Sequence, residues 1–227
     1  MRIVSLVPSV TETLLAWDIT PIACTRFCEQ PSLLAVGGTK DPDIDAIVAL
    51  RPDLVVVDEE ENRREDHDAL VAAGIDVHVL AIRDVGDVDA QLGSLAARLG
   101  ARWEPVGSAV PRSPRRRAFI PIWRRPWMAL GAPTYGTSLL ATLGIENVYA
   151  TDAYPEVTLD DARARMPAVV LAPSEPYPFG ERQREELEAV APVVFVDGKD
   201  LFWWGVRTKD AMARLDLAIG EAPTRPS

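Results

Sequence analysis

Short apolar runs alternate with helical patterns along the first third of the chain. The apolar runs are rich in β-branched residues and predict strands at residues 3–7, 21–25, 54–57 and 77–81. Apolar residues recur at helical spacing in residues 11–17, 43–50 and 66–73. Because strands that alternate with helices pair in parallel, this order predicts a parallel sheet with helices on both faces.

Local signals indicate where the first three helices begin and end. Ser9 is followed three residues later by Glu12, which is the pattern of a capping box, so we expect Ser9 to cap the first helix. Gly74 follows the third helix and predicts its end. In the second helix, the side chains expected to face the core are Ile44, Ile47, Val48 and Leu50.

The second half of the chain repeats this plan. Strand patterns cover residues 119–122, 127–130, 168–172 and 193–196, and helical patterns cover 132–143, 159–165, 181–190 and 208–219. Pro8-Ser9 followed by Leu-Leu-Ala has a counterpart in Pro133-Thr134, which is also followed by Leu-Leu-Ala. The repeat predicts two similar lobes, each a mainly parallel sheet flanked by helices, with a cleft between them.

A helical pattern at residues 87–101 separates the two halves. It is followed by an irregular stretch that contains Pro105, Pro111 and Pro114, and proline excludes a continuous helix there. We therefore expect an N-terminal lobe over residues 1–84, a linking helix and proline-rich connection over 85–116, and a C-terminal lobe over 117–227.

Composition narrows the classes of function. The formal net charge of −10 argues against a nucleic-acid partner, which would require a basic surface. Membrane insertion is not expected, because no run of about 18 apolar residues is present. The sequence has no signal-peptide pattern, so we expect a cytoplasmic protein as written, or an extracytoplasmic one if the chain is a processed mature form. We expect a monomer.

The sequence carries no motif of a known catalytic or metal site. It lacks a nucleophile elbow, a phosphate-binding P-loop and a dinucleotide fingerprint, so we expect a protein that is not an enzyme and has no catalytic residues. Its two histidines and two cysteines are too few for a classical zinc site. For Cys24 and Cys28, two partly buried free thiols are the favoured interpretation, and a disulfide between them is the alternative.

Several segments resemble the periplasmic-binding-protein family for iron-siderophores and cobalamin, in which two lobes are joined by one long helix. The matching segments are RIVSLVPSVTETLLA, VGGTKDPDIDAIVALRPDLVVV, GAPTYGTSLLATLGIENVYA and WWGVR. The resemblance implies a substrate-binding protein that holds a metal chelate and delivers it, with no covalent cofactor, to an ABC-transporter permease. The proline-rich connection departs from the family, where the linking helix usually continues.

The expected ligand surface comes from the loops that follow the strands, since ligands of open parallel sheets bind beyond the carboxyl ends of the strands. Aromatic residues are only 7% of the chain, yet many fall in these loops, and their faces suit a broad flat ligand such as cobalamin or another corrinoid. Trp127, Tyr177, Trp203 and Trp204 could instead be core residues, and Arg26 could form a salt bridge. The full set of candidate ligand-binding residues is Pro8, Ser9, Thr11, Arg26, Phe27, Trp123, Trp127, Tyr135, Glu175, Tyr177, Phe179, Trp203 and Trp204.

The resemblance also implies a surface for the transporter. In transporter-linked relatives a glutamate on each lobe docks onto permease arginines, and Glu65 and Glu181 lie in the corresponding regions. Two alternative functions stay open: a haem or ferric-siderophore binder, and a ligand-dependent sensor that contacts a partner through the acidic loop at residues 59–61.

Overall fold

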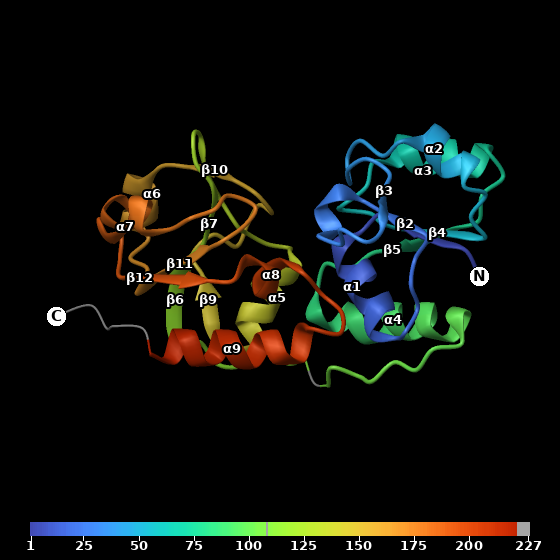
Figure 1. Ribbon diagram of the computed structural model, residues 1–227. Coiled ribbons are helices and arrows are strands. Elements are labelled where there is room, and N and C mark those ends of the chain that lie inside the picture. Colours follow the sequence, from blue (N-terminus) through green and yellow to red (C-terminus); the bar gives the residue numbers. More distant parts are fainter. Residues whose placement is uncertain (108, 222–227) are drawn as a thin grey trace. The chain divides into compact units, whose positions relative to one another are not determined.

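The computed structural model describes residues 1–107 and 109–221, which divide into two compact units (Figure 1). The N-terminal unit contains Met1–Ile82 and Asp87–Pro105, and the C-terminal unit contains Arg83–Gly86 and the chain from Val106 onward. Within the described ranges, no helix has the length and apolar character needed to cross a membrane.

The N-terminal unit is built on one five-stranded parallel sheet in the order β3-β2-β1-β4-β5. Helices α2 and α3 lie on one face of the sheet, and α1 and α4 lie on the other (Figure 1). The elements are β1 (Ile3–Ser5), α1 (Pro8–Ala16), β2 (Ala23–Cys24), the 3-10 helix η1 (Arg26–Cys28), β3 (Leu34–Ala35), α2 (Ile44–Ala49), β4 (Leu54–Asp58), α3 (Arg64–Ala72), β5 (Val77–Leu80) and α4 (Val85–Leu99).

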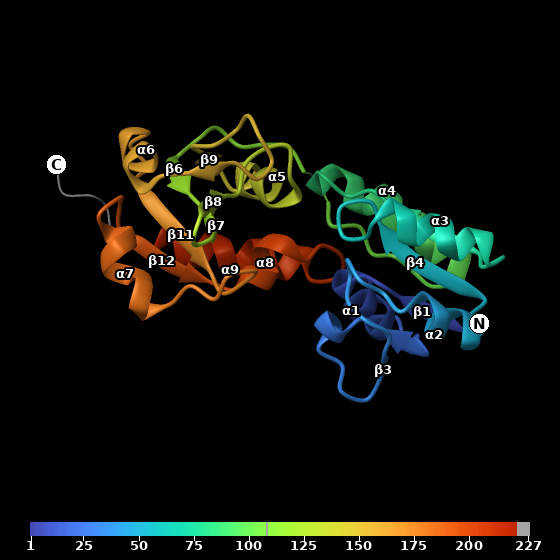
Figure 2. The same ribbon diagram turned by 90° about the horizontal axis from the view of Figure 1, so that it is seen from above.

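The C-terminal unit contains two sheets. The larger one is parallel, with the order β12-β11-β6-β9, and the smaller one is antiparallel, with the order β10-β8-β7. In both views α6 and α7 lie at the same end of the unit, and α9 runs past β12 (Figures 1 and 2). The elements are β6 (Arg116–Phe119), β7 (Pro121–Trp123), β8 (Trp127–Ala129), α5 (Tyr135–Thr142), β9 (Ile145–Asn147), β10 (Glu156–Val157), α6 (Leu159–Ala164), β11 (Val169–Pro173), α7 (Glu181–Glu188), β12 (Val193–Val196), α8 (Gly198–Phe202) and α9 (Thr208–Gly220).

Each unit has its own apolar core. In the N-terminal unit the core forms around β1 and β4, where Val4, Leu6, Val55 and Val57 pack with Ile47 of α2. In the C-terminal unit every residue of β11 is buried, and Phe119, Val170 and Leu187 belong to one cluster. The predicted α/β class, with mainly parallel sheets flanked by helices, is confirmed.

Two local predictions in the N-terminal unit were wrong. Helix α1 begins at Pro8, its N-cap is Val7, and no side chain caps it. Proline at the first helical position needs no N–H partner and already has a helical φ, which moves Ser9 into the first turn. For α2 the error concerns Val48 alone, which is 37% exposed because a helix of six residues presents a narrow face to the sheet. Ile47 is fully buried, and Ile44 and Leu50 are partly buried and pack against the core as predicted.

In the C-terminal unit, the single strand predicted at residues 119–122 is two strands in different sheets. β6 ends at Phe119 in the parallel sheet, and β7 begins at Pro121 in the antiparallel one. Pro121 has no N–H to continue the ladder, which accounts for the break. Of the loops expected to follow the strands and carry the candidate aromatic residues, the one at residues 201–204 is partly helical, since α8 continues to Phe202.

Candidate functional site

Two loops meet at the carboxyl edge of the parallel sheet in the C-terminal unit. β11 leads into residues 174–179, and the neighbouring strand β12 leads into α8. The Gly198 N–H donates a hydrogen bond to Ser174 Oγ at 3.0 Å. A Cβ on Gly198 would lie 2.6 Å from the Glu175 nitrogen and 2.8 Å from its carbonyl oxygen, so only glycine permits this approach. The first turn of α8 is therefore packed directly on the loop that carries Glu175, Tyr177 and Phe179.

This close packing gives a testable prediction. Gly198→Ala should lower the free energy of unfolding by about 1–3 kcal/mol, because the added methyl group collides with the Glu175 backbone as well as with its side-chain Cγ, and the backbone cannot easily move away. Urea denaturation measures the change. Gly220→Ala is the matched control, since nothing lies within 4 Å of its added Cβ, and it should leave stability unchanged or raise it slightly. Equal stability of the two variants would contradict the proposed contact.

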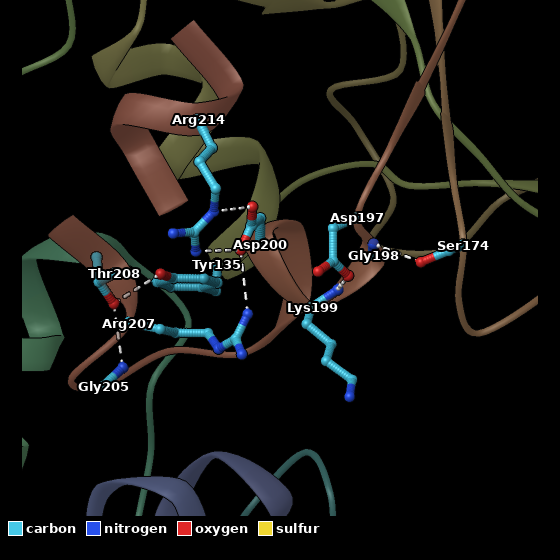
Figure 3. A network of polar contacts seen from close by, with 10 residues as sticks. All are labelled: Tyr135, Ser174, Asp197, Gly198, Lys199, Asp200, Gly205, Arg207, Thr208 and Arg214. Carbon is cyan, nitrogen blue, oxygen red and sulfur yellow. Dashed lines mark hydrogen bonds and ion pairs between the residues drawn. The ribbon is translucent and has the colours of Figure 1, made fainter. Parts of the chain in front are cut away.

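The almost fully buried carboxylate of Asp200 connects α8 to α9 through two arginine side chains (Figure 3). Asp200 accepts two hydrogen bonds from Arg214, each at 2.7 Å, and one from Arg207 at 3.0 Å. The Asp200 side chain is 4% exposed, whereas that of Arg214 is 54% exposed. Charge-assisted bidentate pairing of this kind fixes both the position and the orientation of a guanidinium. Asp200 therefore fixes Arg214, and its hydrogen bond with Arg207 holds that side chain beside it as well.

Two cationic side chains lie close to the ring of Trp203, the residue that follows α8. The Arg207 Cζ lies 5.4 Å from the centre of its ring, and the Lys199 Nζ lies 4.8 Å from it. Both distances are within the range of cation–π attraction. Trp203 is half-buried, so part of its ring reaches the surface. The result is a partly exposed aromatic side chain with two cationic neighbours.

Four aromatic rings of the C-terminal unit contact one another in series. We call this series the aromatic ladder; its rings, in order of contact, are Trp123, Tyr177, Phe179 and Trp127. Ring centres are 5.8 Å apart for Trp123 and Tyr177, 4.7 Å for Tyr177 and Phe179, and 5.9 Å for Phe179 and Trp127. Phe179 is buried, whereas Trp123 is 44% exposed. The buried member, Phe179, therefore lies within the series, between the partly buried Tyr177 and Trp127, and Trp123 is the most exposed ring.

The structure places two other predicted aromatic residues in the interior. Trp204 is 4% exposed, and so is Tyr135. The Tyr135 hydroxyl is 2.9 Å from Thr208 Oγ1, a contact that ties α5 to α9 (Figure 3). Burial raises the pKa of Tyr135 above its ordinary value, which keeps the phenol protonated at neutral pH. Their surroundings suit a role in packing.

In the N-terminal unit, the predicted residues follow β1 and β2. Pro8, Ser9 and Thr11 are all buried at the start of α1, and Thr11 makes hydrogen bonds inside the unit. Phe27 is 49% exposed, and the Arg26 Cζ lies 4.7 Å from its ring centre. Arg26 also forms an ion pair with Asp41 at 3.0 Å. Phe27 is thus the residue of this group that offers most apolar surface.

The two glutamates of the predicted docking surface are both exposed. Glu65 lies in the first turn of α3. Glu181 begins α7 and forms an ion pair with Arg184 at 2.6 Å, and this partner lowers the pKa of its carboxyl group. The docking role of Glu65 and Glu181 stays a prediction.

Sequence reasoning missed three residues of this region: Gly198, Lys199 and Asp200. All three lie in α8, a helix of five residues that is too short to show helical periodicity. A local signal was present, because Asp197 followed by Gly198 is a typical cap and turn pair, and the Asp197 carboxylate accepts a hydrogen bond from the Lys199 N–H at 3.0 Å.

Among residues 1–107 and 109–221 there is no group of three or more His, Cys, Asp or Glu side chains that could hold a metal ion. Partly exposed rings and cationic side chains can bind a flat or anionic molecule through stacking and charge.

Comparison with known proteins agrees with a binding role. A family model described as a periplasmic binding protein matches residues 3–191. The vitamin B12-binding protein of Salmonella typhimurium is 25% identical over 189 residues, which cover 75% of this chain and 71% of the relative. The corresponding protein of Vibrio vulnificus is 24% identical over 187 residues, covering 73% of this chain and 68% of the relative.

Solved structures share the fold at lower identity. The periplasmic vitamin B12 binding protein BtuF of Vibrio cholerae superposes with a TM-score of 0.78 at 18% identity, over 96% of each chain. A periplasmic heme binding protein from Pseudomonas aeruginosa superposes with a TM-score of 0.79 at 20% identity, over 100% of this chain and 95% of the other.

Proposed function

Because the chain belongs to the periplasmic binding protein family, we propose that it binds a large planar metal chelate, and that the chelate is cobalamin or another corrinoid. The observation that carries this proposal is the partly buried Trp203 beside Lys199 and Arg207 in the C-terminal unit. Trp123 and Tyr177 form a separate pair of rings in the same unit. The curated relatives described above are named for vitamin B12 binding, which favours a corrinoid. The protein would serve transport or trafficking of the chelate, with an ABC-transporter permease as its partner.

Stacking accounts for how this surface would hold a corrinoid. A rigid ring buries a large apolar area with little loss of side-chain entropy, and a macrocycle offers a matching flat face. A ligand stacked on the ring of Trp203 would displace one of its two cationic neighbours, Lys199 or Arg207. Arg207 is held by Asp200, so its stem forms a fixed edge to the surface.

Haem is the second candidate, and one observation favours it. Lys199 and Arg207 both stand beside Trp203, and cations in that position suit a flat ligand that carries carboxylates at its rim. The heme binding protein of Pseudomonas aeruginosa shares the fold. Parallel titrations with cobalamin and haem separate the two candidates.

Substitution of the exposed rings tests the proposed surface. Trp203→Ala should weaken binding of the preferred chelate by about 5- to 150-fold, which corresponds to about 1–3 kcal/mol for one stacked anchor. Absorbance titration measures the affinity. Trp103→Ala is the matched control, because Trp103 is also half-buried but belongs to the N-terminal unit, where it packs on Trp17 with ring centres 6.2 Å apart. Full affinity in a folded Trp203→Ala variant would contradict the proposal.

A further inference from the structure

Two cysteines lie at the ends of a short turn in the N-terminal unit. Cys24 is the last residue of β2, and Cys28 is the last residue of η1. Both are free thiols, and each is only 2% exposed. The turn between them carries Arg26 and Phe27, which are both exposed. The function proposed above makes no use of either sulfur.

The Cys28 sulfur is surrounded by hydrogen-bond donors. The Cys24 thiol donates to it. Thr11 Oγ1 on α1 donates to it at 3.1 Å, and the Thr25 hydroxyl lies 3.2 Å away. Donors favour the thiolate over the thiol, and together they lower the pKa of Cys28 to about 6 although burial opposes them.

Cys24 has the opposite character. Its hydrogen bond to Cys28 and its burial both raise its pKa, so it stays a protonated thiol at neutral pH. The turn therefore holds one thiolate and one thiol in contact. A reactive sulfur of lowered pKa beside a second thiol is the arrangement of a dithiol that closes to a disulfide in two steps.

We propose that Cys24 and Cys28 form a peroxide-sensitive pair, in which Cys28 is oxidised first and Cys24 then closes a disulfide with it. Hydrogen peroxide is the oxidant, and its small size suits sulfurs that are almost fully buried.

The chemistry balances over two steps. The Cys28 thiolate attacks one peroxide oxygen, so an S–O bond forms, the O–O bond breaks, and the hydroxide released takes a proton from solvent to become water. The Cys24 sulfur then attacks the sulfenic acid of Cys28. An S–S bond forms, the S–O bond breaks, and the departing hydroxide takes the Cys24 proton and leaves as a second water. Two thiols are oxidised and one peroxide is reduced to two waters.

Oxidation of Cys28 makes Cys24 easier to deprotonate, and so favours closure of the disulfide. The negative charge on Cys28 and its hydrogen bond raise the Cys24 pKa, and both disappear when Cys28 becomes a sulfenic acid. Cys24 then loses its proton more readily. The resulting bond of about 2 Å is much shorter than a hydrogen-bonded contact between sulfurs, so η1 must shift toward β2. The thiolate that accepts from Thr11 is lost as well, and the segment that carries Arg26 and Phe27 is released from α1.

Intact mass and thiol titration after mild peroxide treatment test the proposal. The folded wild-type protein should lose both titratable thiols and two hydrogen atoms, and a reductant should restore them. Dimedone, a probe that captures sulfenic acids, should label Cys28 in Cys24→Ser, where nothing resolves the intermediate. It should leave Cys28→Ser unlabelled. We therefore expect dimedone to label Cys24→Ser and not Cys28→Ser.

A conservative substitution separates activation of Cys28 from simple packing. Thr11→Val removes the donor but keeps the shape, and should slow sulfenic acid formation in the Cys24→Ser background by about threefold or more. Thr13→Val is the matched control, because Thr13 is equally buried on α1 and donates to the Ser9 carbonyl instead. Two thiols that persist in the folded wild-type protein, under peroxide that oxidises the urea-unfolded protein, would overturn the proposal. That measurement needs no variant, so it decides the outcome even if a substitution prevents folding.

Discussion

Asp200→Asn is expected to lower the free energy of unfolding by about 2–4 kcal/mol. The variant places an amide N–H₂ where a carboxylate accepts three hydrogen bonds, and it leaves Arg207 and Arg214 without their shared anion. The loss is smaller than for a fully buried triad because Arg214 is half exposed and water can solvate it. Urea denaturation followed by circular dichroism measures the change.

Asp210→Asn is the control for this substitution. Asp210 is exposed on α9, four residues before Arg214, and its replacement should change stability by less than about 0.5 kcal/mol. A similar small effect for Asp200→Asn would mean that the ion pairs between α8 and α9 do not hold this region together.

Trp204→Ala should be more damaging still, with an expected loss of about 3–5 kcal/mol. Its side chain is 4% exposed, so removing the indole leaves a cavity that the packed unit can fill only in part. Thermal or urea unfolding gives the value.

The neighbouring Trp203→Ala provides the comparison, because it removes the same ring from a half-buried position. It should cost much less stability than Trp204→Ala while weakening ligand binding. If Trp203→Ala and Trp204→Ala were equally destabilising, Trp203 would belong to the core, and the assignment of a binding surface to it would be wrong.

Most of the fold was predictable because its strands are strongly patterned. Residues 54–57 of β4 and all of β11 are buried and apolar, which is typical of strands covered on both faces. The long amphipathic segment at α9 marked its helix for a similar reason, because many residues contribute to one signal. The elements that escaped prediction, β3, β9, β10 and α8, have two to five residues each and show no period.

The candidate site was harder to predict because exposure depends on tertiary packing. Trp203 and Trp204 are adjacent in the sequence and have the same chemistry, yet one is half-buried and the other is in the core. Arg207 pairs with Asp200, which is seven residues earlier on a helix that the pattern did not reveal. The tight contact of Gly198 with Glu175 joins two loops 23 residues apart, and no local signal encodes it.

The most direct test of the central claim is absorbance titration of the purified protein with cobalamin, with haem and a ferric siderophore in parallel. A chelate-binding protein of the kind proposed here should give a saturable spectral change with cobalamin at one ligand per chain, and Trp203→Ala should shift its midpoint to higher concentration. A folded protein that shows no saturable change with cobalamin, haem or the ferric siderophore would contradict the account.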